Sequence, residues 1–486
     1  MGFKADTSFL KYLTMGAVGT KRVIEELRLL GFMPVELERY CTANKIWATK
    51  VKRLRMPDLL CARTGLRIEV RSKSALVLKM SDAPANPDRK WDAGLRDEDI
   101  IAFVAVTDEG GALTTGPAQY FTVRAFREAV GTSALGPPKS ASEGAERDRT
   151  WPSTVPKRSG IVTSVSDARI VLEFGSESGG TRRQTYSLGN KVPYVSAGDS
   201  VAGNKAFLAG TPAKTSDLRP FLGTAYDPIQ GLRANNVLDR FAAVKALWVR
   251  RELRDEAIPL LERMLRSEPD ARVALEAAGV AAASGSRPGR AYIRDLVNGE
   301  GRTDLQMEAV FILTEIGDEY SLRGLRHVTT AGCFKGSEMR QAAVWGLGKS
   351  GLRSYTDLIK FVADEDDNVA MHAICAFGEE ADAEAIKGLI ALLLGTEWRA
   401  SAGASEALQR IGSDAVIEAL LEPAEGGSAW AVATLGRLPA DRVEARLSGS
   451  RLYDAVAPLL LLNGSANWLS TDDRRADLAF LAKQSL

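Results

Sequence analysis

The chain has 486 residues, 45% hydrophobic and 26% charged, an average composition for a globular protein but too many residues for one ordinary core. It contains no apolar run of about 18 residues and no signal-peptide core, so we predict a cytoplasmic protein without a membrane span. Four scattered cysteines and only two histidines, His327 and His372, argue against a disulfide framework, a zinc site and a His-based metal centre.

The formal net charge of +1 hides an asymmetry between the two halves of the chain. Residues 1–220 carry 33 Lys+Arg against 24 Asp+Glu, whereas residues 221–486 carry 30 against 38. Within residues 44–73, nine residues are basic and two are acidic. The basic first half predicts contact with a polyanion such as DNA, the alternative being an ordinary solvated surface. The acidic second half favours a protein partner.

Residues 1–130 mix helix and strand patterns. Residues 21–30 predict an amphipathic helix closed by Gly31. Residues 58–71 predict two strands around a turn, and the continuous apolar run 100–106 predicts a strand buried on both faces. Residues 121–129 predict a short helix, and residues 131–158, rich in Gly, Pro, Ser and charge, predict a linker.

Residues 159–215 predict a small β-barrel, because short β-rich runs alternate with Gly and Ser. The stretch from Val195 through Gly198-Asp199 to Gly203 resembles the barrel-sandwich hybrid of biotinyl and lipoyl carriers. That resemblance implies a tight turn at Gly198-Asp199 and a following valine, Val201, that points into the core. No Met-Lys pair marks an attachment site, and a generic small barrel is an equal alternative.

From residue 225 to residue 486 the chain predicts helix after helix. Four helices are predicted to end at Ile316-Gly317, Leu347-Gly348, Phe377-Gly378 and Ile411-Gly412, about 30 residues apart. Five residues before the glycine, three of the four helices have alanine, and four residues before it each helix has a large apolar residue. The small residue favours close packing of neighbouring helices, and the large one fills the layer between them. The pattern resembles HEAT repeats, and this implies an α-solenoid with a long binding surface.

The best catalytic candidate is Met56-Pro57-Asp58, followed after ten residues by Glu69-Val70-Arg71-Ser72-Lys73. This spacing resembles the core of the PD-(D/E)XK nucleases, a restriction-endonuclease-like α/β fold. The resemblance implies that Asp58 and Glu69 bind Mg²⁺ or Mn²⁺, with Glu26 on the first helix as a third carboxylate. Hard cations take carboxylate oxygens, and a bound metal activates water and neutralises charge on the phosphate.

Glu69, Arg71 and Lys73 are spaced by two, so a strand places them on one face. A four-residue turn at 62–65 would place Asp58 opposite Glu69, whereas a three-residue turn would face it away. The family's lysine position holds Arg71, which stays protonated and is a poor general base. Lys73, on the same face, could take the lysine's role; otherwise the fold is degenerate and only binds DNA.

Basic residues cluster just before this motif: Lys45, Lys50, Lys52, Arg53 and Arg55. They would neutralise phosphates, and Trp47 among them would either stack on a base or belong to a core.

The predicted fold class is therefore multidomain: a restriction-endonuclease-like α/β domain, a small all-β barrel and a C-terminal α-solenoid. The favoured function is a metal-dependent DNA endonuclease or nuclease subunit, with the solenoid as a scaffold that positions a protein partner or the DNA. The combination of modules suggests restriction or phage defence by analogy only. The alternative is a non-enzymatic adaptor. A HEAT-repeat DNA glycosylase is a weaker third reading, because its helical surface should be basic.

Overall fold

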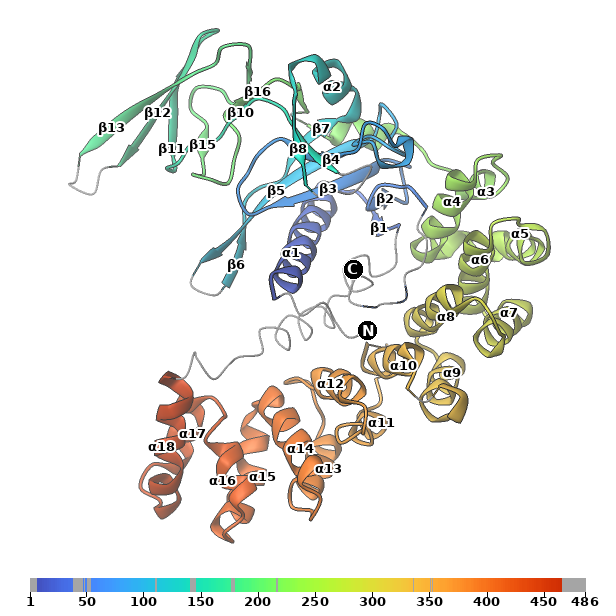
Figure 1. Ribbon diagram of the computed structural model, residues 1–486, viewed down its shortest axis with the longest axis vertical. Helices are drawn as coiled ribbons and strands as arrows, with labels where there is room; N and C mark the ends of the chain where they lie inside the picture. Colours follow the sequence, from blue (N-terminus) through green and yellow to red (C-terminus); the bar gives the residue numbers. More distant parts are fainter. Residues whose placement is uncertain are drawn as a thin grey trace. The chain divides into compact units, whose positions relative to one another are not determined.

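The computed structural model describes residues 7–37, 47, 49, 54–109, 112–139, 146–175, 180–215, 217–334, 336–349, 351 and 353–465. The chain divides into two compact units, which we call the sheet unit and the array unit (Figure 1). The sheet unit comprises Lys11–Asn44 and Lys52–Leu261, and the array unit comprises Met1–Leu10, Lys45–Val51 and Glu262–Ser485. The described residues Trp47 and Thr49 therefore belong to the array unit, although the described residues before and after them in the sequence belong to the sheet unit.

The sheet unit is built on a mixed sheet with the strand order β1-β2-β3-β5-β7-β17, and β6 pairs with the end of β5. The strands are β1 Pro34–Glu36, β2 Leu59–Cys61, β3 Arg67–Lys73, β5 Ile100–Glu109, β6 Ala112–Thr115, β7 Gln119–Thr122 and β17 Lys214–Thr215. Strands β3 and β5 are parallel, and the other neighbours are antiparallel. The predicted hairpin and the predicted buried strand are thus adjacent.

Helix α1 (Thr7–Leu29) covers one face of this sheet. Its Val23 and Leu27 share a core with Ile68 and Val70 of β3. The helix begins earlier than the predicted residue 21, but it ends where predicted, followed by Gly31 at φ 93°. Because side chains alternate along a strand, residues 67, 69, 71 and 73 of β3 lie on the opposite face.

Aromatic side chains fill the opposite face. Phe103 and Phe121 of the sheet contact Phe126 of α2 (Val123–Glu128), which packs edge-on against Trp151 at 4.8 Å between ring centroids. Trp151 is fully buried. It follows β9 (Arg147–Thr150), which pairs with β4 (Lys79–Asp82) and β8 (Ala134–Pro138). A linker was predicted for residues 131–158, but the described part of this range forms strands. Trp151 anchors these strands in the core.

The β-rich module, predicted as a small barrel, consists of two open sheets whose residues share one core. One has the order β13-β12-β11-β15 and the other β10-β16-β14. Their bounds are β10 Ser153–Thr154, β11 Gly160–Val165, β12 Arg169–Gly175, β13 Thr181–Ser187, β14 Val192–Pro193, β15 Ser200–Val201 and β16 Ala209–Gly210. The predicted turn is present, with Gly198 at φ 95°, and Val201 is buried in the module's core. Strands of two residues are too short to close a barrel.

The rest of the described chain is helical. Helices α3 (Pro228–Gly231) and α4 (Val237–Val249) belong to the sheet unit, where Ala242 and Ala246 of α4 pack on Leu37 and Leu60. The sheet unit therefore extends past residue 225 into the predicted solenoid. None of the described helices is long and apolar enough to cross a membrane.

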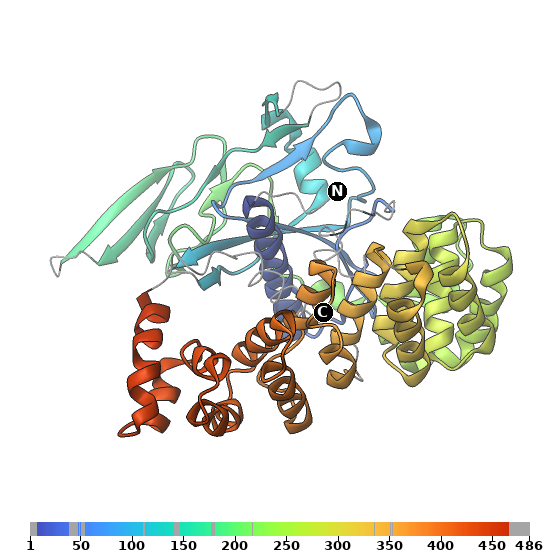
Figure 2. The ribbon, with the colours of Figure 1, turned by 60° about the horizontal axis from the view of Figure 1, so that its bottom comes forward.

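The array unit stacks its helices in two layers, of which the even-numbered helices form one. Figure 2 shows the stacked helices from a second direction. The helices are α5 Arg254–Ser267, which spans the boundary between the units, α6 Ala271–Ala283, α7 Arg287–Asn298, α8 Thr303–Ile316, α9 Glu319–Thr330, α10 Glu338–Lys349, α11 Tyr355–Ile359, α12 Asp367–Cys375, α13 Ala383–Leu393, α14 Trp398–Ile411, α15 Asp414–Glu425, α16 Ala429–Leu435, α17 Ala440–Leu447 and α18 Arg451–Ser465. A helical repeat was predicted, and this stack of short helices confirms it.

Two of the four predicted glycine caps are left-handed helix ends, Gly317 at φ 63° and Gly412 at φ 55°. Gly348 instead lies within α10, where an added Cβ would stand 2.3 Å from the Cβ of Ala376. That glycine therefore permits close approach of neighbouring helices and does not cap one.

His372 of α12 makes the stability of the array dependent on pH. Burial lowers the pKa of its imidazole from 6.5 to about 4, against the opposing influence of Asp366. The unfolded chain therefore binds the extra proton first, and stability is lost as the pH falls below 6.5. Between pH 7 and pH 5 the free energy of unfolding is therefore expected to fall by about 2 kcal/mol.

Urea unfolding at pH 7 and pH 5, followed by circular dichroism, measures this loss. We expect His372→Phe, which keeps a ring but cannot titrate, to lose about 2 kcal/mol less than the wild type over the same interval. Equal losses in the two proteins would contradict the assignment.

Candidate active site

Asp58 lies directly before β2, and the strand register decides where it faces. Leu59 pairs with Ile68 and Leu60 with Arg67, so Asp58 lies opposite Glu69. This is the register of the four-residue turn, in which Gly65 has φ 76°. Asp58 Oδ2 accepts a hydrogen bond of 2.8 Å from the backbone N–H of Val70. The two candidate carboxylates are therefore neighbours across β2 and β3.

Arg71 interacts with both carboxylates. Its Nη1 is 2.5 Å from Glu69 Oε1, and one-third of its side chain is exposed. Burial acts to lower the pKa of Arg71, but the charges of Glu69 and Asp58 outweigh it, so the pKa is raised. The guanidinium is thus a permanent cation held against two acidic groups.

Lys73, two residues farther along the same face of β3, is a cation of a different kind. Burial, assisted by the charges of Arg71, Lys79 and Lys139, lowers the pKa of Lys73 to about 8, while Asp148 opposes the shift. Asp148 itself binds Lys79 Nζ and Lys139 Nζ, each at 2.8 Å. Near pH 8 about half of Lys73 is therefore neutral and able to accept a proton, whereas at pH 7 most of it is charged.

Glu26 does not share a site with Asp58 and Glu69. It belongs to α1 and accepts hydrogen bonds from Tyr120 Oη at 2.9 Å, the backbone N–H of Ala118 at 3.1 Å and Arg22 Nε at 2.7 Å. Tyr120 shares the core of the α1 face, whereas Glu69 lies on the other face of the sheet. Burial and the charge of Glu26 raise the pKa of Tyr120. Within the described part of the chain, no group of three or more His, Cys, Asp and Glu could hold a metal ion.

The structure describes only one of the predicted DNA-binding residues, Arg55. Lys45, Lys50, Lys52 and Arg53 lie outside the described residues. Arg55 is exposed, and its backbone carbonyl packs so closely on Gly94 that a Cβ there would stand 2.3 Å away. Trp47 is buried in the array unit, so it is a core residue and not a free stacking platform.

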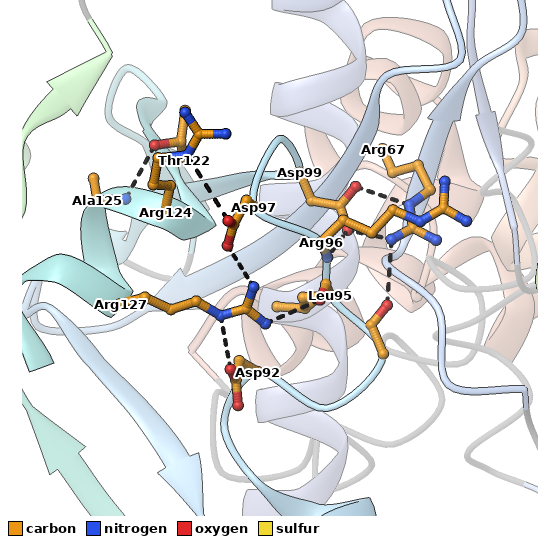
Figure 3. A network of polar contacts seen from close by, with 11 residues as sticks. Arg67, Asp92, Leu95, Arg96, Asp97, Asp99, Thr122, Arg124, Ala125 and Arg127 are labelled. Atoms are coloured by element: carbon orange, nitrogen blue, oxygen red, sulfur yellow. Dashed lines mark hydrogen bonds and ion pairs between the residues drawn. The ribbon is translucent and has the colours of Figure 1, made fainter.

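An arginine–aspartate network connects β3 and α2 with the loop before β5 (Figure 3). Arg67 donates its Nε to Asp99 at 2.8 Å, and both side chains are buried. Arg127 of α2 forms ion pairs with Asp92 at 2.9 Å and Asp97 at 2.5 Å, which attach the loop before β5 to α2. The sequence offered no signal for these pairs, because their partners are about 30 residues apart in different elements.

The segment Arg89–Arg96 precedes β5 in the sequence and carries three basic residues. Its two arginines form ion pairs: Arg89 binds Glu146 at 2.9 Å, and Arg96 binds Asp239. Trp91 packs against Trp151 at 5.3 Å between ring centroids, so its role is structural.

Comparison with solved structures found matches that cover about half of this chain. No protein-family model and no curated protein matches the chain. The X-ray structure of YibA from E. coli is 12% identical, covers 49% of this chain and 92% of its own, and has a TM-score of 0.26. The CpcE–CpcF complex of phycocyanin lyase from Nostoc is 17% identical, covering 50% and 96%, with a TM-score of 0.26. Human deoxyhypusine hydroxylase is 15% identical, covering 49% and 94%, with a TM-score of 0.20.

Proposed function

We propose that the sheet unit is a metal-dependent nuclease acting on DNA, with Asp58 and Glu69 as the ligands of Mg²⁺ or Mn²⁺. The observation that carries this proposal is the pairing register, which places Asp58 opposite Glu69 and puts Arg71 and Lys73 on the same face. The order of helix, strand hairpin and buried strand also agrees with the PD-(D/E)XK resemblance. A role in restriction or phage defence is part of this proposal by analogy alone.

Two neighbouring carboxylates are a sufficient protein donor set for Mg²⁺, which commonly keeps several waters and takes one or two carboxylates. When bound, the metal would supply an acidified water and charge neutralisation at the phosphate. Arg71 would then turn from Glu69 toward a phosphate oxygen, where a guanidinium binds well. Lys73, with its pKa lowered to about 8, would accept the proton of the attacking water.

The second candidate is an adaptor that grips nucleic acid without cleaving it. The ion pair between Arg71 and Glu69 favours this alternative, because the guanidinium already supplies positive charge where a metal would bind. For either function we propose that the acidic array unit holds a protein partner, since its residues 262–485 carry 33 acidic against 24 basic residues.

Cleavage of supercoiled plasmid and of linear single- and double-stranded DNA tests the proposal. The wild type is run with Mg²⁺, Mn²⁺ or EDTA beside Asp58→Ala and the matched control Asp167→Ala, an exposed aspartate in a turn of the β-rich module. We expect cleavage with either metal, none with EDTA, loss in Asp58→Ala and wild-type rates in Asp167→Ala.

The other outcomes decide against the proposal in different ways. DNA binding without cleavage under any metal would favour the adaptor. Metal-dependent cleavage that Asp58→Ala retains in full would place the active site elsewhere.

A further inference from the structure

Two lysines of the sheet unit converge on one aspartate. Lys79 belongs to β4, and Lys139 directly follows β8. Asp148 of β9 pairs with both, because Lys79 Nζ is 2.8 Å from its Oδ2 and Lys139 Nζ is 2.8 Å from its Oδ1. Lys139 Nζ also donates a hydrogen bond of 2.9 Å to Ser81 Oγ. We call Lys79, Ser81, Lys139 and Asp148 the lysine site.

The strand register places the lysine site on the outer face of the sheet formed by β4, β9 and β8. Ser81 lies directly opposite Asp148, and Lys79, two residues before Ser81, shares its face. The other face carries Met80 and Asp82, each 1% exposed. The two lysine side chains of the site are 37% and 43% exposed. A ligand in solution can therefore reach them.

The lysine site lies within electrostatic range of the candidate active site. Burial lowers the pKa of Lys73 to about 8, and the charge of Arg71 is the next cause. The charges of Lys79 and Lys139 also lower this pKa, while that of Asp148 opposes the shift. These groups are neighbours, because charges farther apart than about 10 Å are largely screened. Positive charge thus accumulates beside the face of β3 that carries the candidate carboxylates, and a bound anion would relieve the repulsion.

We propose that the lysine site binds a backbone phosphate of DNA, next to the phosphate that the candidate active site would hold. This inference rests on the proposed function, because it takes DNA as the ligand. The ammonium groups of Lys79 and Lys139 can contact the two free oxygens of one backbone phosphate, and Ser81 Oγ can donate to the same group. Lys73 remains available to the candidate active site. A contact to the backbone would position the DNA without reading its sequence.

The salt dependence of DNA binding tests the site. Binding of a labelled duplex is measured in EDTA at several salt concentrations for the wild type, the double variant Lys79→Ala, Lys139→Ala and the matched control Lys21→Ala, an exposed lysine of α1. Each phosphate contact adds about 0.9 to the steepness with which log affinity falls against log salt. We expect the double variant's slope to be shallower by about one on two unrelated sequences, and the control to keep the wild-type slope.

The variant Asp148→Asn changes the lysine site in the opposite direction. It keeps the size of the side chain but removes the carboxylate that competes with a phosphate for Lys79 and Lys139. We expect the affinity for DNA to rise severalfold, which damage to the fold would not produce. A fall in affinity would contradict the proposal, because the ion pairs would then matter and the accumulated positive charge would not.

An unchanged salt slope in the double variant would overturn the proposal. Calorimetry with inorganic phosphate distinguishes the other source of this ligand. Phosphate binding that the double variant loses, without a change in the DNA slope, would assign the site to a free phosphate and reject DNA. Cleavage assays with Mg²⁺ on the same proteins separate this inference from the nuclease function. A shallower slope in proteins that never cleave would retain the phosphate site and reject the nuclease, whereas cleavage with an unchanged slope would do the reverse.

Discussion

Replacing Glu69 by glutamine is expected to lower metal-dependent DNA cleavage about a thousandfold, equivalent to about 4 kcal/mol of transition-state stabilisation. The amide keeps the size of the side chain but removes the charge that would bind the metal opposite Asp58. It also releases Arg71 from its 2.5 Å ion pair, so affinity for DNA should be unchanged or higher. Cleavage rates and DNA binding, measured on the same preparation, separate the two effects.

Glu26→Gln is the matched control, because it makes the same change on the other face of the sheet. Glu26 is engaged by Tyr120 and Arg22, so we expect a change in stability and little change in the cleavage rate of the folded protein. A thousandfold loss in Glu26→Gln with full activity in Glu69→Gln would reverse the assignment of the metal ligands.

Replacing Asp99 by alanine is expected to destabilise the sheet unit by about 3–5 kcal/mol, since it leaves Arg67 buried without its counter-ion. Arg67 and Asp99 are 4% and 2% exposed. Asp99 accepts from Arg67 Nε at 2.8 Å and from the backbone N–H of Arg96 at 2.7 Å. Urea unfolding followed by tryptophan fluorescence measures the loss, because Trp91 and Trp151 lie in this unit.

Two controls separate a buried pair from ion pairs in general. Glu173→Ala removes the partner of Arg183, whose side chain is 71% exposed, and should cost less than about 1 kcal/mol. The double variant Arg67→Met, Asp99→Leu removes both charges and should recover most of the stability that Asp99→Ala loses. If Asp99→Ala costs no more than Glu173→Ala, the pair does not support β3 as we describe.

Local sequence patterns predicted the elements that carry their own signal. The apolar run at 100–106 became a buried strand, Gly31 followed the first helix, and Gly317 and Gly412 ended two helices in the left-handed conformation. These signals are short-range, because backbone conformation and burial periodicity depend on neighbours within a few residues. The alternation of Glu69, Arg71 and Lys73 on one strand face was readable for the same reason.

Contacts between distant residues could not be read in this way. The register that sets Asp58 opposite Glu69 depended on the length of a turn, and the place of Glu26 depended on which face α1 covers. The polar segment 131–158 joined the core because Trp151 packs against Trp91 and Phe126, which lie in other elements.

The sequence by itself determined that this protein joins an α/β region and a β-rich region to a helical repeat, because each has its own periodicity. Only the tertiary structure decided which charges meet, namely Arg67 with Asp99 and Arg71 with Glu69, and which faces they share. It also decided that Trp47 belongs to the array. Such pairings depend on packing between segments far apart in the chain, and no local pattern records them.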